Sequence, residues 1–172
     1  MSKVPRSRLL VHAHRGAHRD RFKAFFADGG IDPARIEFVD GKPLHEYYDL
    51  HNQIDIALDP FPYAGGTTTC DALWMGVPVI SLVGKLGTSR AGLSLLSNVG
   101  LPELAVSAVN EYIDVAAALA GDLPRLSALR ESLRSRMTSS PLTNAREFTS
   151  HLENAFRSMW QAWCETQHAN RS

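Results

Sequence analysis

The sequence predicts an α/β fold: a Rossmann-like parallel sheet flanked by helices, with a C-terminal helical tail. Short apolar runs rich in β-branched residues alternate with helical stretches, and glycines follow most of those helical stretches. Strands separated by single helices need crossover connections, so the strands should be parallel. Glycine tolerates the left-handed conformation in which many helices end, so it marks the helix boundaries.

Three predicted strands lie in the first half of the chain, each a short apolar run: LLVHA at 9–13, IEFV at 36–39 and IDIAL at 54–58. A helix at 17–28 places Phe22, Phe25 and Phe26 on one side and stops at a pair of glycines. A shorter helix at 44–50 connects the second strand to the third.

The clearest strand pattern in the second half is VPVISLV at 77–83. Its proline lies near the start, where the loss of one N–H donor matters least. A helix at 67–75 precedes this strand, a helix at 88–98 follows it, and a short strand at 104–106 comes next. The tail, at about 110–165, holds three further predicted helices: 110–120, 124–137 and 143–164.

Length and composition favour one compact domain over residues 1–172. The chain has 18 basic and 18 acidic residues, so no broad field points to nucleic acid or a membrane as partner. Cys70 and Cys164 fit no zinc or redox spacing, and no apolar run approaches the ~20 residues that span a bilayer. No carboxylate or thiol accompanies His12 and His14, so we expect no metal, and a cytoplasmic protein with reduced thiols.

A candidate binding site lies in the run DPFPYAGGTTTCD at 59–71, between the third strand and the helix after it. Ligands of open parallel sheets bind beyond the carboxyl ends of the strands, where this run falls. Gly65 and Gly66 remove side chains from the turn, and the hydroxyls of Thr67 and Thr68 add donors to the free N–H groups of the helix start. The pattern suits a diphosphate without any lysine or arginine.

The same run also has a purely structural interpretation. Thr68 and Asp71 fit the capping pattern [ST]-x-x-[DE], and two glycines suit a turn without any ligand. The run is neither a Walker loop nor a G-x-G-x-x-G fingerprint, so spacing alone leaves both interpretations open. The run at 84–90 offers a second anion contact at the same sheet edge, with Thr88 or Ser89 as a simple N-cap as the alternative.

Longer runs carry a resemblance to a known family. GGTTTCDALWMGVP at 65–78, SRAGLSLLSNVGLPEL at 89–104 and RIEF at 35–38 resemble the C-terminal catalytic lobe of the O-linked N-acetylglucosaminyltransferase family. This tetratricopeptide-associated family includes bacterial members and the plant SPINDLY-like enzymes. The resemblance runs from Ser7 to Cys164 and implies one lobe of a GT-B glycosyltransferase, whose active site lies between two Rossmann-like lobes.

The resemblance also implies roles for single residues. The turn at 65–68 would hold the diphosphate of a nucleotide sugar, most simply UDP-N-acetylglucosamine, without a cofactor or metal. Asp71 would bind the ribose, since a carboxylate can accept from both ribose hydroxyls. Tyr47 stands where the family often has an aromatic or imidazole ring, and would stack on the base.

The sequence departs from the family pattern close to the expected nucleotide. The family's frequent histidine before the threonine pair is Gly66 here, and basic residues near the ribose and base are replaced by Leu44 and Leu50. If the loop is shifted, His45, Lys42 or His51 would substitute for them.

The resemblance places several functional parts outside this chain: the acceptor-facing lobe, the repeats, and a lysine that neutralises the leaving diphosphate. We therefore expect no catalytic residue here and no activity of the chain alone. We expect either a separate N-terminal lobe or self-association to cover apolar surface. A non-catalytic nucleotide-binding or regulatory module derived from such a transferase is the alternative.

The tail carries an apolar stripe at spacings of three and four: Phe148, Leu152, Ala155, Phe156, Met159, Trp160 and Trp163. Such a stripe predicts a helix that packs on the sheet's own helices, and the alternative is that part of it covers a neighbouring domain. The helix before it is polar, which suggests a solvated face for four arginines: Arg125, Arg130, Arg134 and Arg136.

Overall fold

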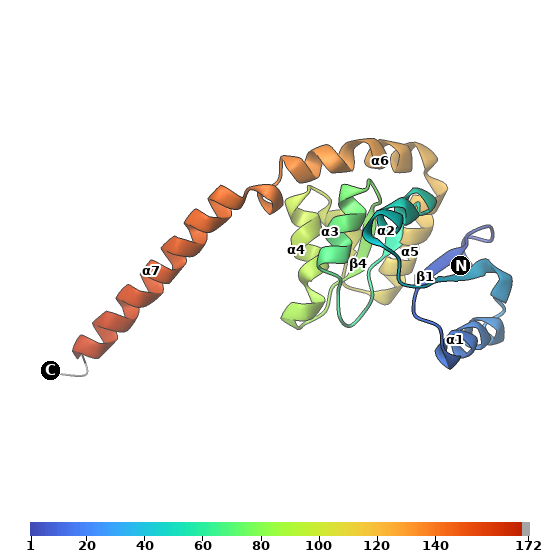
Figure 1. Cartoon of the computed structure of the whole chain (residues 1–172), viewed down its shortest axis with the longest axis horizontal. Coiled ribbons are helices and arrows are strands. Elements are labelled where there is room, and N and C mark those ends of the chain that lie inside the picture. The colour runs from blue at the N-terminus through green and yellow to red at the C-terminus, as the bar shows by residue number, and fades with distance from the viewer. Residues whose placement is uncertain (170–172) are drawn as a thin grey trace.

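The computed structural model describes residues 1–169, so residues 170–172 of the predicted domain lie outside it. It confirms a mixed α/β fold with parallel strands flanked by helices (Figure 1). The strands are β1 (Leu9–His12), β2 (Ile36–Val39), β3 (Ala57–Leu58), β4 (Val79–Leu82) and β5 (Ala105–Val106). The helices are α1 (Ala17–Asp28), α2 (Leu44–Leu50), α3 (Thr67–Trp74), α4 (Ala91–Asn98), α5 (Val109–Gly121), α6 (Leu123–Thr138) and α7 (Ala145–Ala169).

Backbone hydrogen bonds divide the strands into two parallel sheets. β1 pairs with β2, with Leu9 opposite Ile36. β4 lies between β3 and β5, with Ala57 opposite Val79 in one ladder. In Figure 1 the unit formed by β1, α1 and β2 lies beside the larger body. The parallel pairing agrees with the prediction, whereas the division into two sheets is not visible in the sequence.

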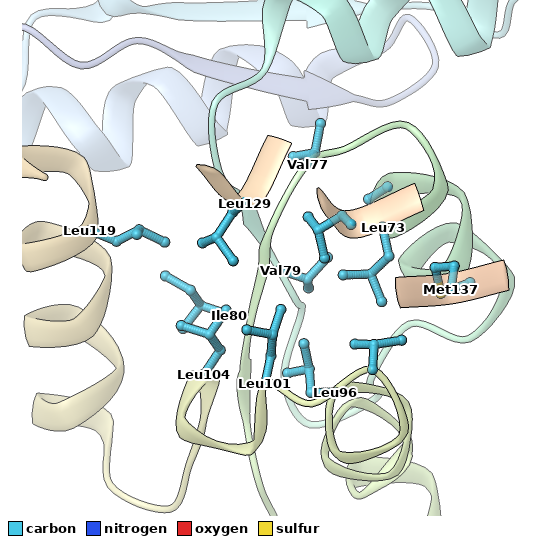
Figure 2. Packing of buried hydrophobic residues seen from close by; sticks show 13 residues of the cluster. Leu73, Val77, Val79, Ile80, Leu96, Leu101, Leu104, Leu119, Leu129 and Met137 are labelled. Atoms are coloured by element: carbon cyan, nitrogen blue, oxygen red, sulfur yellow. The ribbon is translucent and has the colours of Figure 1, made fainter. Parts of the chain in front are cut away.

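The core of the larger body surrounds β4, the central strand of the second sheet (Figure 2). Val79 and Ile80 of β4 are almost completely buried, as expected for a parallel strand that is covered on both faces. Helices on either side supply the residues packed against them: Leu73, Leu96, Leu119, Leu129, Leu133 and Met137. Because β4 is anchored in this core, the core also holds in place the loops that follow β3 and β4.

The arginines of α6 correct two expectations. Arg130 donates from Nη1 to the carbonyl of Ile54 and from Nη2 to the carbonyl of His51, both at 2.9 Å. The strand predicted at 54–58 is shorter than expected: only Ala57 and Leu58 pair with β4, and the Ile54 carbonyl accepts from Arg130 instead. Arg134 donates to the Trp74 carbonyl at 3.0 Å. The predicted solvated face of α6 holds for exposed Arg125 and Arg134, whereas Arg130 is partly buried and ties the helix to another segment.

α7 leaves the body as an extended helix (Figure 1). We call its apolar face the α7 stripe: Phe148, Leu152, Ala155, Phe156, Met159, Trp160 and Trp163. Its large side chains are exposed, from 41% for Leu152 to 65% for Phe148. The expectation that this stripe packs on the sheet's own helices is wrong. Within residues 1–169, no helix is both long enough and apolar enough to cross a membrane.

Candidate functional site

The glycine-threonine turn forms the start of α3, at the carboxyl end of β3. Gly66 is the N-cap residue, and no side chain of the described residues caps this helix. The first N–H groups of a helix have no partner within it, so they face outward here beside exposed Thr67 and Thr68. The capping alternative for Thr68 and Asp71 is wrong.

The buried carboxylate of Asp59 supports the turn through hydrogen bonds. Its Oδ1 accepts from the Gly65 N–H at 2.6 Å, and its Oδ2 accepts from the Ser81 hydroxyl at 2.6 Å. Thr69 Oγ1 lies 3.5 Å from Oδ1. Asp59 therefore joins the loop after β3 to β4 and to the first turn of α3. Sequence reasoning missed this role, because an aspartate before a proline indicates only the end of a strand.

The two glycines of the turn have different surroundings. A Cβ on Gly65 would lie 2.5 Å from Thr69 Oγ1 and 3.0 Å from Asp59 Oδ1, which is too close for any side chain. A Cβ on Gly66 would meet no atom within 4 Å. Gly65 is therefore needed for packing, and Gly66 borders open space in front of the free N–H groups.

The loop after β4 lies against this turn. The Ala64 N–H donates to the Thr88 carbonyl at 3.1 Å, which ties the two loops together. Ser89 is buried and its hydroxyl donates to the Leu86 carbonyl at 2.8 Å. Among the described residues no side chain caps α4, so the simple N-cap interpretation of Thr88 or Ser89 is wrong. Exposed Arg90 stands at the start of that helix.

Asp71, one turn into α3, accepts two phenolic hydroxyls from α2. Tyr47 donates to Oδ2 at 3.0 Å and Tyr48 to Oδ1 at 3.3 Å. Burial, followed by the bond to Asp71, raises the pKa of Tyr47 to about 12, and the Asp71 charge raises the pKa of Tyr48. An ionised carboxylate has about four lone-pair sites, so Asp71 keeps room for further donors.

The three candidate substitutes for the missing basic residues differ in availability. His51 is buried and its Nδ1 lies 3.1 Å from the Tyr47 carbonyl oxygen. Lys42 forms an ion pair with Glu46 at 2.8 Å. His45 is exposed on α2. The structure thus brings Tyr47 and Asp71 together and leaves His45 the most accessible of the three.

Comparison with known proteins assigns most of this chain to one family. The family model described as Glycosyl transferase family 41 matches residues 1–152. The chain belongs to glycosyl transferase family 41. This match confirms the family resemblance carried by the runs at 65–78 and 89–104.

Named relatives of this family 41 chain agree with that assignment. It is 41% identical over 169 residues to the probable UDP-N-acetylglucosamine–peptide N-acetylglucosaminyltransferase SPINDLY of Petunia hybrida, covering 94% of this chain and 18% of the relative. It is 33% identical to the probable enzyme SEC of Arabidopsis thaliana, covering 97% of this chain and 17% of the relative. A mutant of the Thermobaculum terrenum O-GlcNAc transferase superposes with a TM-score of 0.88 at 39% identity. That match covers 94% of this chain and 32% of the other. The chain thus spans a minor part of each.

Gly66, Thr67 and Thr68 are exposed, so the turn of this family 41 chain lies at the surface. Two shallow hollows of about 500 Å³ lie elsewhere, one at the start of α7 and one between the end of β5 and α5. Neither is lined by a residue of the run 59–71. Within residues 1–169, no group of three or more His, Cys, Asp or Glu side chains could hold a metal ion.

Proposed function

We propose that this chain is the nucleotide-sugar-binding lobe of a GT-B protein O-glycosyltransferase. UDP-N-acetylglucosamine is the proposed donor, and serine or threonine hydroxyls of a protein are the proposed acceptors. The observation that supports it most is the uncapped start of α3, whose free N–H groups and positive helix end suit a diphosphate. The cytoplasm is the proposed compartment, since Cys70 and Cys164 are both unpaired.

Each residue of the site has a proposed role. The free N–H groups at the start of α3 and the hydroxyls of Thr67 and Thr68 donate to the diphosphate, which lies over Gly66. Asp71 uses its remaining lone pairs for the ribose hydroxyls. Tyr47 positions Asp71 through its hydrogen bond, and its ring borders the base. His45 is the exposed side chain available to the base or the sugar.

These roles concern the leaving group of the reaction. When the acceptor oxygen bonds to the sugar's anomeric carbon, the bond to the diphosphate breaks and negative charge develops on the UDP oxygens. Preorganised N–H and hydroxyl donors at the turn stabilise that charge. Placement of the acceptor and removal of its proton are proposed to belong to a second lobe, so this chain alone is not expected to transfer sugar.

Calorimetric titration of the purified chain with UDP, UDP-N-acetylglucosamine, GDP and GDP-fucose tests the proposal. We expect selective binding of the UDP ligands and a loss of at least about tenfold in affinity in Thr67→Ala/Thr68→Ala, since hydrogen bonds to charged groups are involved. The control is Thr138→Ala/Thr149→Ala, which removes two exposed hydroxyls from α6 and α7 and should leave binding unchanged.

The titration has two informative failures. A folded chain that binds none of the four ligands would show that the turn only starts a helix. Selective UDP binding, without any transfer when a complementary transferase lobe is added, would instead favour the regulatory nucleotide-binding module.

A further inference from the structure

We infer that Tyr48 acts with Tyr47 as a positioning residue that makes the site selective for ribonucleotides over deoxyribonucleotides. The two phenol hydroxyls take one lone pair on each oxygen of Asp71. They leave the remaining lone pairs for the neighbouring 2′ and 3′ hydroxyls of a ribose. The inference rests on the proposed function, which places a nucleoside diphosphate at the start of α3, and it concerns the ribose rather than the base.

The two hydroxyls divide the carboxylate of Asp71 between them. Tyr47 donates to Oδ2 at 3.0 Å, and Tyr48 donates to Oδ1 at 3.3 Å. A carboxylate has about four lone-pair sites, two on each oxygen, so each oxygen keeps one acceptor site. Two adjacent hydroxyls of a ribose can donate to the two oxygens of one carboxylate at the same time. A 2′,3′-dideoxyribose has neither donor and would leave both acceptor sites unfilled.

The phenols orient Asp71 without neutralising its charge. Burial and the bond to Asp71 raise the pKa of Tyr47 to about 12, and the Asp71 charge raises the pKa of Tyr48, so both hydroxyls keep their protons at neutral pH. No ion pair among residues 1–169 includes Asp71. Hydrogen bonds to an ionised acceptor are stronger than those between neutral groups. The free lone pairs of Asp71 therefore suit hydroxyl donors of a ligand.

The surroundings of α2 hold the two phenol rings in place. Side chains at successive positions of a helix point roughly 100° apart, so they do not normally meet at one acceptor. The rings of Tyr47 and Tyr48 have centroids 5.3 Å apart, and buried His51 meets the Tyr47 ring edge-on at 5.1 Å. Arg130 on α6 donates to the His51 carbonyl at 2.9 Å and so fixes the C-terminal end of α2. Packing within the chain thus directs both hydroxyls toward α3, which lies beside α2 in Figure 1.

A positioning role has a consequence that a purely structural role lacks. Without the Tyr48 hydroxyl, Oδ1 of Asp71 loses its donor and the carboxylate can turn away from the ribose. Affinity for a ribonucleotide should then fall, whereas a dideoxyribonucleotide has no hydroxyl to donate to Asp71 and should bind as before. A residue that only stabilises the fold would weaken both ligands by the same factor. The ratio of the two affinities therefore separates the two roles.

Calorimetric titration with UDP and 2′,3′-dideoxy-UDP, and with GDP and 2′,3′-dideoxy-GDP, tests the inference. For the base that the chain binds, the wild type should prefer the ribonucleotide at least about tenfold, since the analogue loses hydrogen bonds to a charged acceptor. Tyr48→Phe should reduce this preference at least about threefold, through weaker binding of the ribonucleotide alone. Tyr47→Phe should act in the same way, and the double variant should show a larger effect. Phenylalanine keeps the ring, so contacts between the ring and the base are retained.

Two further variants calibrate the measurement. Tyr112→Phe is the matched control, because the Tyr112 hydroxyl is also partly buried but donates to the Asp59 carbonyl at 3.1 Å. This variant loses a comparable bond to a different acceptor and should keep the wild-type ratio. Asp71→Asn should lose the preference for the ribonucleotide, since an amide offers one acceptor oxygen in place of two. Circular dichroism should show all of these variants folded.

Two outcomes would overturn the inference without affecting diphosphate binding at the turn. Equal affinity of the wild type for a ribonucleotide and its dideoxy analogue would show that Asp71 does not bind the ribose hydroxyls. An unchanged ratio in folded Tyr48→Phe would show that Tyr48 only joins α2 to α3. A folded chain that binds none of the four nucleotides would overturn the proposed function and this inference together.

Discussion

The Ser81 hydroxyl donates a 2.6 Å hydrogen bond to Oδ2 of Asp59, two residues that lie 22 positions apart in the sequence. Both side chains are buried, and the bond joins the end of β3 to β4 next to the glycine-threonine turn. The other carboxylate oxygen accepts from the Gly65 N–H. Gly92 at the start of α4 packs against the same pair, since a Cβ there would lie 2.1 Å from Ser81 Oγ. One buried carboxylate thus holds four segments around the proposed site.

We predict that Asp59→Ala lowers the free energy of unfolding by about 2–3 kcal/mol, because it leaves the Gly65 N–H and the Ser81 hydroxyl without their acceptor. Ser81→Ala removes one donor only and should cost less. Urea unfolding followed by circular dichroism measures both values. Two equal costs, or an Asp59→Ala variant as stable as the wild type, would contradict this account.

The two glycines of the turn should respond differently to alanine. Gly65→Ala should lower the free energy of unfolding by about 1–3 kcal/mol, because the new Cβ overlaps Thr69 and Asp59. Gly66→Ala has open space and should cost less than about 1 kcal/mol, as a poorer N-cap. If a diphosphate lies over Gly66, however, that variant should lose at least about fivefold in UDP affinity. Unchanged UDP affinity in Gly66→Ala would place the diphosphate elsewhere.

Much of the fold could be predicted because its signals are local. Helices 17–28 and 44–50 and the strand 36–39 have the predicted bounds, since apolar spacing and neighbouring glycines determine them. The division into two sheets could not be predicted, because strand pairing depends on contacts between distant segments. The α7 stripe shows the same limit: its spacing predicted the helix and gave no information on what covers it.

The candidate site shows a similar division. The turn at 65–68 lies at the carboxyl end of β3 and at the start of a helix, as predicted. Its support by Asp59 could not be read from the sequence, because the partners Gly65 and Ser81 follow no fixed spacing. The bond between Tyr47 and Asp71 was also unforeseen, since the family resemblance suggested stacking for the tyrosine ring.

Arg130 should be far more important for stability than Arg125 on the same helix. Arg130 donates to two backbone carbonyls, whereas Arg125 forms an exposed ion pair with Glu103 at 3.1 Å. We expect Arg130→Met to lower the free energy of unfolding by about 1–3 kcal/mol. Arg125→Met serves as the control and should change it by less than about 1 kcal/mol. Urea denaturation of both variants measures the difference, and similar losses would show that the bonds from Arg130 to the segment before β3 contribute little to stability.

The stability of the protein should fall in alkaline solution because two tyrosines must stay neutral in the fold. Burial raises the pKa of Tyr47 and of Tyr112 to about 12, from an ordinary value of 10. The Tyr47 hydroxyl donates a hydrogen bond to Asp71, and the Tyr112 hydroxyl donates one to the Asp59 carbonyl at 3.1 Å. Because both pKa values are higher in the folded state, this stability is fully present below pH 10 and is lost as the pH rises through 12.

Urea unfolding at pH 8, 10 and 11 measures this loss. The free energy of unfolding of the wild type should decrease over that range, and the decrease should be smaller in Tyr47→Phe/Tyr112→Phe, which has no phenol to ionise at either position. Tyr63→Phe changes a side chain that is 72% exposed and should keep the wild-type slope. Lysines that titrate in the same range are common to all three proteins and cancel in the comparison. If the free energy of unfolding fell equally with pH in the double variant and the wild type, neither partly buried phenol would contribute to the alkaline loss of stability.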